Sequence, residues 1–135
     1  MLIRKAFKFE LMPNGVQARK MKQFCGCSRF VFNKALAYQN EQYQQDNSFK
    51  FSYYKLTSLL PEWKQELVWL KDCHSQVLQS SLKDLESSFK NFFAKRADFP
   101  KFKKKGTKES FRFPQGYKLE QHNNRIWLPK IGWVR

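Results

Sequence analysis

The stretch "SQVLQSSLKDLESSFKNFFAK", residues 75–95, carries the clearest pattern in the chain. Its large apolar residues are separated by four, three, four and three positions: Leu78, Leu82, Leu85, Phe89 and Phe92. This spacing places their side chains on one stripe of an α-helix. We therefore predict a helix from Ser75 to about Lys95, with this stripe buried against other helices.

The sequence before this stretch predicts further helices. Asn14 suits an N-cap, because its side-chain oxygen can accept from the free amides of a first turn. We expect helix over 15–45, with an interruption possible near Gly26. A loop over 46–51 follows. Ser52 can cap a short helix over 53–60, and Pro61 can open another over 61–70, because proline tolerates the first helical position.

Both ends of the chain predict strands. Phe7, Phe9 and Leu11 alternate with charged residues, which indicates a half-buried strand ended by Pro13. The segment "YKLEQHNNRIWLP", 117–129, predicts a hairpin turned by Asn123-Asn124, since asparagine tolerates positive φ, and "KIGWVR", 130–135, begins another strand. The fold class is therefore α+β, and we expect the N-terminal strand to pair with the C-terminal strands across the helical block.

Charge is the strongest global property. The net charge is +15, and residues 101–135 hold ten Lys and Arg against two Asp and Glu. Such a field attracts a polyanion, most often nucleic acid. An anionic membrane surface is the main alternative. No apolar run approaches the roughly 20 residues that span a bilayer. The charged N-terminus lacks a signal-peptide core, so we expect a cytoplasmic protein without membrane contact.

The basic charge is densest in "FPKFKKKGTKESFRFP", residues 99–114. Its cations can neutralise phosphates and release counterions: Lys101, Lys103, Lys104, Lys105, Lys108 and Arg112. Alternation in 110–113 favours burial of Phe111 and Phe113 on one side, with Ser110 and Arg112 pointing outward, where they can contact phosphates or bases. A solvated loop is the alternative.

The sequence offers little for catalysis. Its acidic residues are scattered, whereas two-metal nuclease chemistry needs clustered carboxylates. Cys25, Cys27 and Cys73 form neither a disulfide framework nor the four ligands of a structural zinc site. We expect them to be core thiols, with no metal or other cofactor in this chain.

Five segments, in order, resemble the N-terminal part of the TnpB (OrfB) proteins of insertion sequences. They are "AFKFELMPNGVQ", "GCSRFVFNKAL", "SQVLQSSLKDLESSFKNFF", "FPKFKKKGTKESFRFP" and "LPKIGWVR". The resemblance implies a wedge-like β-barrel domain with a helical recognition domain inserted in it. On this basis residues 1–13 are the first barrel strand, 14–98 the helical domain, and 99–135 the basic loop and remaining barrel strands.

The resemblance also implies function. TnpB proteins are RNA-guided DNA nucleases, often labelled transposases, whose barrel and helical block grip a structured guide RNA and the double-stranded DNA motif beside the target. Besides the basic segment, the regions that carry such contacts correspond here to further polar residues: Tyr53, Thr57, Ser75, Gln76, Gln79 and Lys83. Lys83 lies on a second helical stripe that would otherwise be a solvated face.

One departure limits the comparison. In the family, a RuvC-like nuclease domain with three acidic, magnesium-binding residues follows the "LPKIGWVR" segment, whereas this sequence stops at Arg135. We therefore expect nucleic-acid binding without DNA cleavage. Two alternatives stay open: a conventional helix-turn-helix domain that reads duplex DNA, and a shortened regulatory protein that pairs with a full-length partner.

Overall fold

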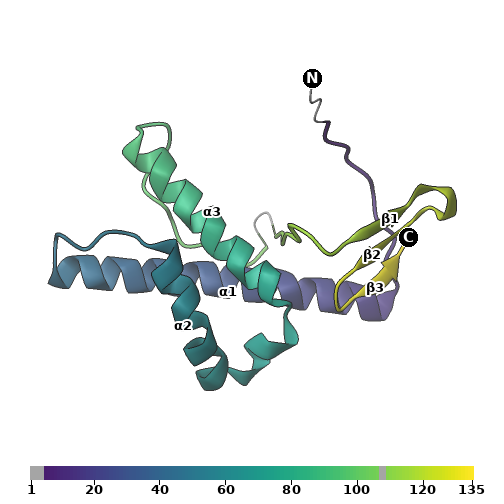
Figure 1. Ribbon diagram of the computed structural model, residues 1–135, viewed down its shortest axis with the longest axis horizontal. Helices are drawn as coiled ribbons and strands as arrows, with labels where there is room; N and C mark the ends of the chain where they lie inside the picture. Colours follow the sequence, from purple (N-terminus) through teal and green to yellow (C-terminus); the bar gives the residue numbers. More distant parts are fainter. Residues whose placement is uncertain (1–4, 107–108) are drawn as a thin grey trace.

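A computed structural model describes residues 5–106 and 109–135. Figure 1 shows a long helix that runs across the molecule and a small sheet near its N-terminal end; one helix packs on the long helix, and another packs on that second helix. In chain order the elements are α1 (Gly15–Gln45), α2 (Tyr53–Glu66), the 3-10 helix η1 (Val68–Asp72), α3 (Ser75–Phe93), β1 (Lys118–Glu120), the 3-10 helix η2 (Gln121–Asn123), β2 (Arg125–Leu128) and β3 (Gly132–Val134). The α+β fold class is confirmed.

α1 begins and ends where the sequence predicts. The Asn14 side chain accepts from the Gln17 amide, and the Gln17 side chain accepts from the Asn14 amide, which completes a capping box. The helix continues through Gly26 without interruption. A mid-helix glycine costs about 1 kcal/mol relative to alanine, and burial of Phe24 and Cys27 on either side offsets that cost.

α2 differs from the expectation of two short helices. Ser52 caps it as predicted, accepting from the Lys55 amide, but the helix continues past Pro61 to Glu66. The buried stripe of Leu56, Leu60 and Trp63 spans the proline, so packing on both sides keeps the two halves in one helix. α2 therefore takes up residues 61–66 of the second expected helix, and η1 takes up only its last three residues, 68–70.

α3 confirms the helix of the opening stretch, ending two residues earlier than expected. Leu78, Leu82, Leu85 and Phe89 are buried, while Phe92 is half-buried at the last turn. The core that α3 shares with α1, α2 and the sheet consists of Phe24, Cys27, Val31, Phe32, Ala35, Leu36, Leu56, Leu60, Trp63, Leu70, Cys73, Val77, Leu78, Leu82, Leu85, Phe89, Leu128, Ile131 and Val134.

The three strands form an antiparallel sheet in the order β1-β2-β3. The predicted hairpin is confirmed, and Asn124 adopts the left-handed conformation with φ 49°. The sheet lies on the N-terminal half of α1: the Gln17 side-chain amide donates to the Trp133 carbonyl at 2.6 Å, and Lys20 Nζ donates to the Lys130 carbonyl at 3.1 Å.

The expected N-terminal strand is absent from the described residues 5–14. Phe7 and Phe9 are 74% and 68% exposed, and the Met12 amide, which donates to the Arg135 carbonyl, makes the one backbone bond between this segment and the sheet region. On the N-terminal side of that hydrogen bond, the segment runs away from the sheet (Figure 1). The alternating pattern predicts only that these apolar side chains share one face. A strand also needs a neighbouring strand to pair with, and this segment has none among the described residues. The sheet is open, so the expected closed barrel is not seen in the part of the chain that the structure describes.

Residues 110–113 likewise form no strand. Among the helices of the described residues, none combines the length and the apolar character that a bilayer span requires.

Candidate nucleic-acid interface

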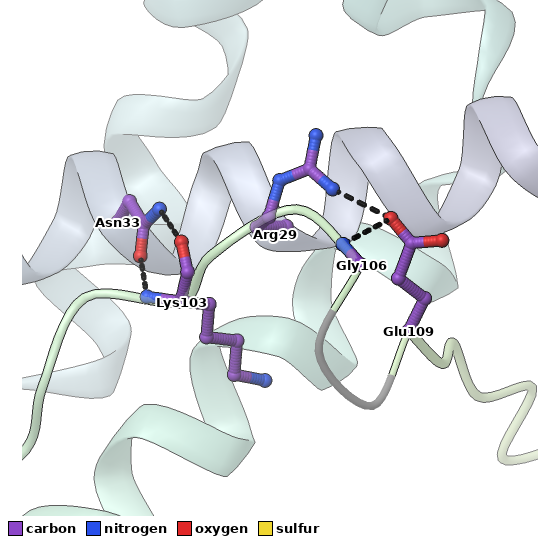
Figure 2. A network of polar contacts seen from close by, with 5 residues as sticks. All are labelled: Arg29, Asn33, Lys103, Gly106 and Glu109. Atoms are coloured by element: carbon purple, nitrogen blue, oxygen red, sulfur yellow. Dashed lines mark hydrogen bonds and ion pairs between the residues drawn. The ribbon is translucent and has the colours of Figure 1, made fainter.

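The basic loop, which we define as residues 101–106, is fixed to the middle of α1 by one side chain. Asn33 Nδ2 donates to the Lys103 carbonyl at 2.9 Å, and the Lys103 amide donates to Asn33 Oδ1 at 2.7 Å (Figure 2). A side-chain amide that satisfies both backbone groups of one residue fixes that residue's position and orientation. The loop backbone is therefore ordered at its centre although its lysines are exposed.

A second set of contacts holds the far end of the loop. Arg29 Nη1 lies 2.9 Å from Glu109 Oε1, and the Gly106 amide donates to the same oxygen at 3.3 Å (Figure 2). Glu109 therefore pairs with Arg29 and Gly106 and not with a loop lysine. Within the described residues, none of the loop lysines forms an ion pair, so the loop presents uncompensated positive charge.

The loop lysines are not equivalent. Lys103 Nζ lies 4.3 Å from the centre of the Phe32 ring, a cation–π distance. Lys101, Lys104 and Lys105 are exposed. Lys108 was also predicted to contact nucleic acid, but it lies outside the described residues.

Residues 110–113 confirm the expected division between inner and outer side chains. Phe111 and Phe113 pack edge to face on buried Phe24, with ring centres 5.6 and 6.2 Å from it. Ser110 and Arg112 are exposed. Arg112 Nη2 lies 2.8 Å from Asp84 Oδ1 on α3, so base reading by Arg112 would compete with this ion pair.

Two predicted residues meet between α2 and α3. Lys83 Nζ lies 4.1 Å from the centre of the Tyr53 ring and 3.2 Å from Glu86 Oε1. The Thr57 hydroxyl donates to the Tyr54 carbonyl at 2.9 Å, which directs it to its own helix. Gln79 is exposed on α3, and its side chain makes no hydrogen bond among the described residues.

Ser75 and Gln76 lie at the N-terminus of α3 among cations that sequence reasoning missed. Lys64 Nζ donates to Ser75 Oγ at 3.1 Å. The Gln76 amide donates to His74 Nδ1 at 3.1 Å, which makes His74 the N-cap. Burial, followed by repulsion from Lys130 and Lys64, lowers the pKa of His74.

These cations come from α2 and from the turn between β2 and β3, so no local spacing predicts their proximity. Lys130 donates through Nζ to the Lys71 carbonyl at 3.1 Å, which ties the sheet to η1. The Lys130 backbone is left-handed, with φ 64°, at a turn position that glycine usually occupies.

Two of the three cysteines are core thiols as expected, whereas Cys25 is only half-buried. Cys27 and Cys73 are buried and line a pocket of about 290 Å³ between α1 and η1. The hydrogen bond with Cys27, together with burial, raises the pKa of Cys73, so this thiol stays protonated. In the described part of the chain, no three His, Cys, Asp or Glu side chains are grouped as a metal site requires.

Comparison with known proteins identifies relatives of this sequence. Residues 1–48 match a helix-turn-helix domain family named for OrfB and IS605. The chain is 57% identical over 132 residues to InsQ of Escherichia coli K12, which is named as a candidate RNA-guided DNA endonuclease. The chain belongs with the N-terminal part of the TnpB/OrfB family.

The match covers 96% of this chain and 33% of InsQ. A second candidate RNA-guided DNA endonuclease, from Streptomyces pristinaespiralis, is 36% identical over 103 residues, which are 75% of this chain and 25% of that protein. The chain thus spans about a third or less of the TnpB/OrfB-type relatives that it matches. The assignment of individual residues to nucleic acid stays a prediction.

Proposed function

We propose that this chain is the nucleic-acid-binding module of a TnpB-type RNA-guided DNA endonuclease. It binds the guide RNA and the DNA motif beside the target, and it does not cleave DNA by itself. The observation that carries the proposal is the basic loop, whose backbone is held on α1 by Asn33 and Arg29. Its lysines are exposed, Lys103 also lying over the Phe32 ring, and none has an acidic partner in the described residues. The names of the two relatives support it.

An ordered basic loop suits phosphate binding for an energetic reason. Ordering the backbone of one residue costs about 1–2 kcal/mol. At Lys103 the hydrogen bond to Asn33 orders the backbone when the chain folds, so nucleic-acid binding does not have to order it. Lysines that contact phosphates contribute affinity through counterion release and carry no sequence information. We assign sequence reading to exposed polar residues, foremost Ser110 beside the loop and Gln79 on α3.

A conventional helix-turn-helix function is the second candidate, and the family description of residues 1–48 favours it. Such domains place a second helix in the major groove after a short turn. Over residues 5–48 the structure instead has an extended segment and one unbroken helix. This geometry favours binding through the basic loop.

The deciding experiment replaces Lys103, Lys104 and Lys105 together with alanine. Affinities for a structured RNA and for duplex DNA are titrated at several salt concentrations. Each lost phosphate contact reduces the slope of log affinity against log salt by roughly 0.7 to 0.9, so three lost contacts lower it by about 2 to 3.

A charge-matched control replaces three exposed lysines of the helical block, Lys50, Lys55 and Lys71, and should change the slope less. An unchanged slope for the loop variant would remove the loop from the binding surface. Incubation of the unmodified chain with guide RNA, Mg²⁺ and matched target DNA should leave the DNA intact.

A further inference from the structure

The C-terminal tip of α3, which we define as residues 89–99, carries an aromatic cluster that is only partly covered. Phe89 is 5% exposed and anchors the cluster, with the Phe99 ring 5.5 Å and the Phe93 ring 6.3 Å away. Phe92 packs edge to face on both Phe93 and Phe99, at 5.2 Å each. Phe93 is nevertheless 72% exposed and Phe99 44% exposed. The tip therefore exposes the Phe93 and Phe99 rings to solvent, and both pack on the buried Phe89 ring, which holds them in place.

The backbone at the tip holds a lysine where glycine is usual. The Lys95 amide donates to the Phe92 carbonyl and the Arg96 amide to the Asn91 carbonyl, both characteristic of a Schellman ending. Lys95 occupies its left-handed position with φ 60°. A side chain costs about 1 kcal/mol or more there, and such a cost is a reason to look for a function.

The same segment carries positive charge. Lys90, Lys95 and Arg96 are exposed within the tip and Lys101 two residues after it, and Asp98 is the one acidic residue between positions 89 and 101. Lys90 lies 3.8 Å from Glu86, a loose contact on the helix surface. The tip projects from the rest of the molecule, away from the sheet (Figure 1).

We propose that the tip of α3 binds unpaired nucleotides, with Phe93 and Phe99 stacking on bases and Lys95 and Arg96 contacting the flanking phosphates. The proposal deepens the proposed nucleic-acid function and rests on it. Exposed rings alone would suit a protein partner equally well. Rings bordered by cations match the alternation of flat bases and phosphates in a single strand. A regular duplex keeps its base faces stacked, so it offers these rings nothing.

The test compares the affinity of the 135-residue chain for a single-stranded RNA of mixed sequence and for a blunt-ended RNA duplex of the same composition. Phe93→Ala should weaken binding of the single strand about fivefold or more, the loss of one stacked base, and leave binding of the duplex unchanged. Phe93→Tyr should retain affinity because its ring still stacks. Phe93→Leu should not, although it keeps most of the apolar surface.

Lys95→Gly provides a second, independent measurement. It relieves the backbone and removes the cation, so the variant should be folded while its salt slope for the single strand falls by roughly 0.7. Phe7→Ala is the matched control, because Phe7 is as exposed as Phe93 but lies in the N-terminal segment. Its single-strand affinity should not change.

The outcomes separate this proposal from the proposed function. Unchanged single-strand affinity in Phe93→Ala, with a reduced salt slope in the triple-lysine loop variant, would overturn the tip proposal and leave the general function standing. No response in either variant would overturn both. Equal losses in Phe93→Ala and Phe7→Ala would mean that exposed rings bind without a specific site. Loss of self-association in Phe93→Ala, seen by sedimentation without a change in nucleic-acid binding, would assign the tip to a second copy of the chain.

Discussion

At the scale of single residues, His74 combines a structural and an electrostatic role. Its ring nitrogen accepts a hydrogen bond from the Gln76 amide at the start of α3. Burial first, and then repulsion from Lys130 and Lys64, lowers the pKa of the ring. The ring also packs edge to face on Phe113, with centres 5.6 Å apart. A protonated ring would lose the accepting nitrogen and add a third positive charge.

This arrangement predicts acid sensitivity with a definite sign. Because the folded pKa of His74 is lowered from its ordinary value of 6.5, the unfolded chain binds the proton more readily. The stabilising contribution is complete above about pH 6.5 and is lost as pH falls through and below that value. Chemical denaturation from pH 8 to pH 5 measures it.

The matched variant for this experiment is His74→Asn, which keeps a good N-cap acceptor without a titrating ring. Its unfolding free energy should fall less over the same pH range. Equal pH dependence in the two proteins would show that His74 contributes nothing to acid sensitivity.

At the scale of elements, α3 carries the packing of the helical block. Its stripe is buried against α1 and α2, and Leu85 is completely buried. Leu85→Ala should lower the unfolding free energy by about 2–5 kcal/mol, the usual range for a core leucine. Leu119→Ala in β1 is the control, because Leu119 is 54% exposed, and its cost should stay below about 0.5 kcal/mol. A loss under about 1 kcal/mol at Leu85 would mean that the stripe packs poorly within this chain.

The elements show which signals were readable from sequence. The bounds of α1 follow from Asn14 and from a helical stripe, both local properties. The break at Pro61 was wrong because the proline rule is local, while the stripe that continues through it depends on contacts with other helices. The N-terminal strand was wrong because alternation at Phe7 and Phe9 says nothing about a pairing partner.

The same distinction applies to the candidate interface. The inward placement of Phe111 and Phe113 follows from alternation and was confirmed. The contact between Asn33 and Lys103 joins residues 70 positions apart, and that between Arg29 and Glu109 joins residues 80 apart. Spacing cannot reveal such pairs, and neither could it reveal that Lys64 and Lys130 lie near His74.

At the scale of the whole molecule, the contact between Asn33 and Lys103 connects the helical block to the basic loop. Asn33→Ala leaves every loop charge in place but removes both hydrogen bonds that order Lys103. Affinity for RNA and duplex DNA should fall severalfold, because binding must then supply ordering that costs about 1–2 kcal/mol per residue. The salt slope should stay the same, since no phosphate contact is lost.

Asn40→Ala is the control for this variant, since Asn40 is another half-buried asparagine of α1 and has no side-chain hydrogen bond in the described residues. A drop in salt slope in Asn33→Ala would show that the contact maintains the number of phosphates bound. Unchanged affinity would show that loop order does not matter for binding.

The length of α1 sets the distance over which one molecule can contact a nucleic acid. Its 31 residues, at about 1.5 Å each, extend for about 46 Å, with the sheet at one end and the tip of α3 directed toward the other (Figure 1). That distance corresponds to roughly 14 base pairs of duplex at about 3.4 Å each. Because the basic loop is fixed to the middle of α1, a duplex centred on the loop and aligned with the helix would have room for roughly 7 base pairs on each side. Affinity should therefore rise with duplex length up to roughly 14 base pairs and then level off, whereas earlier saturation would confine duplex binding to the loop itself.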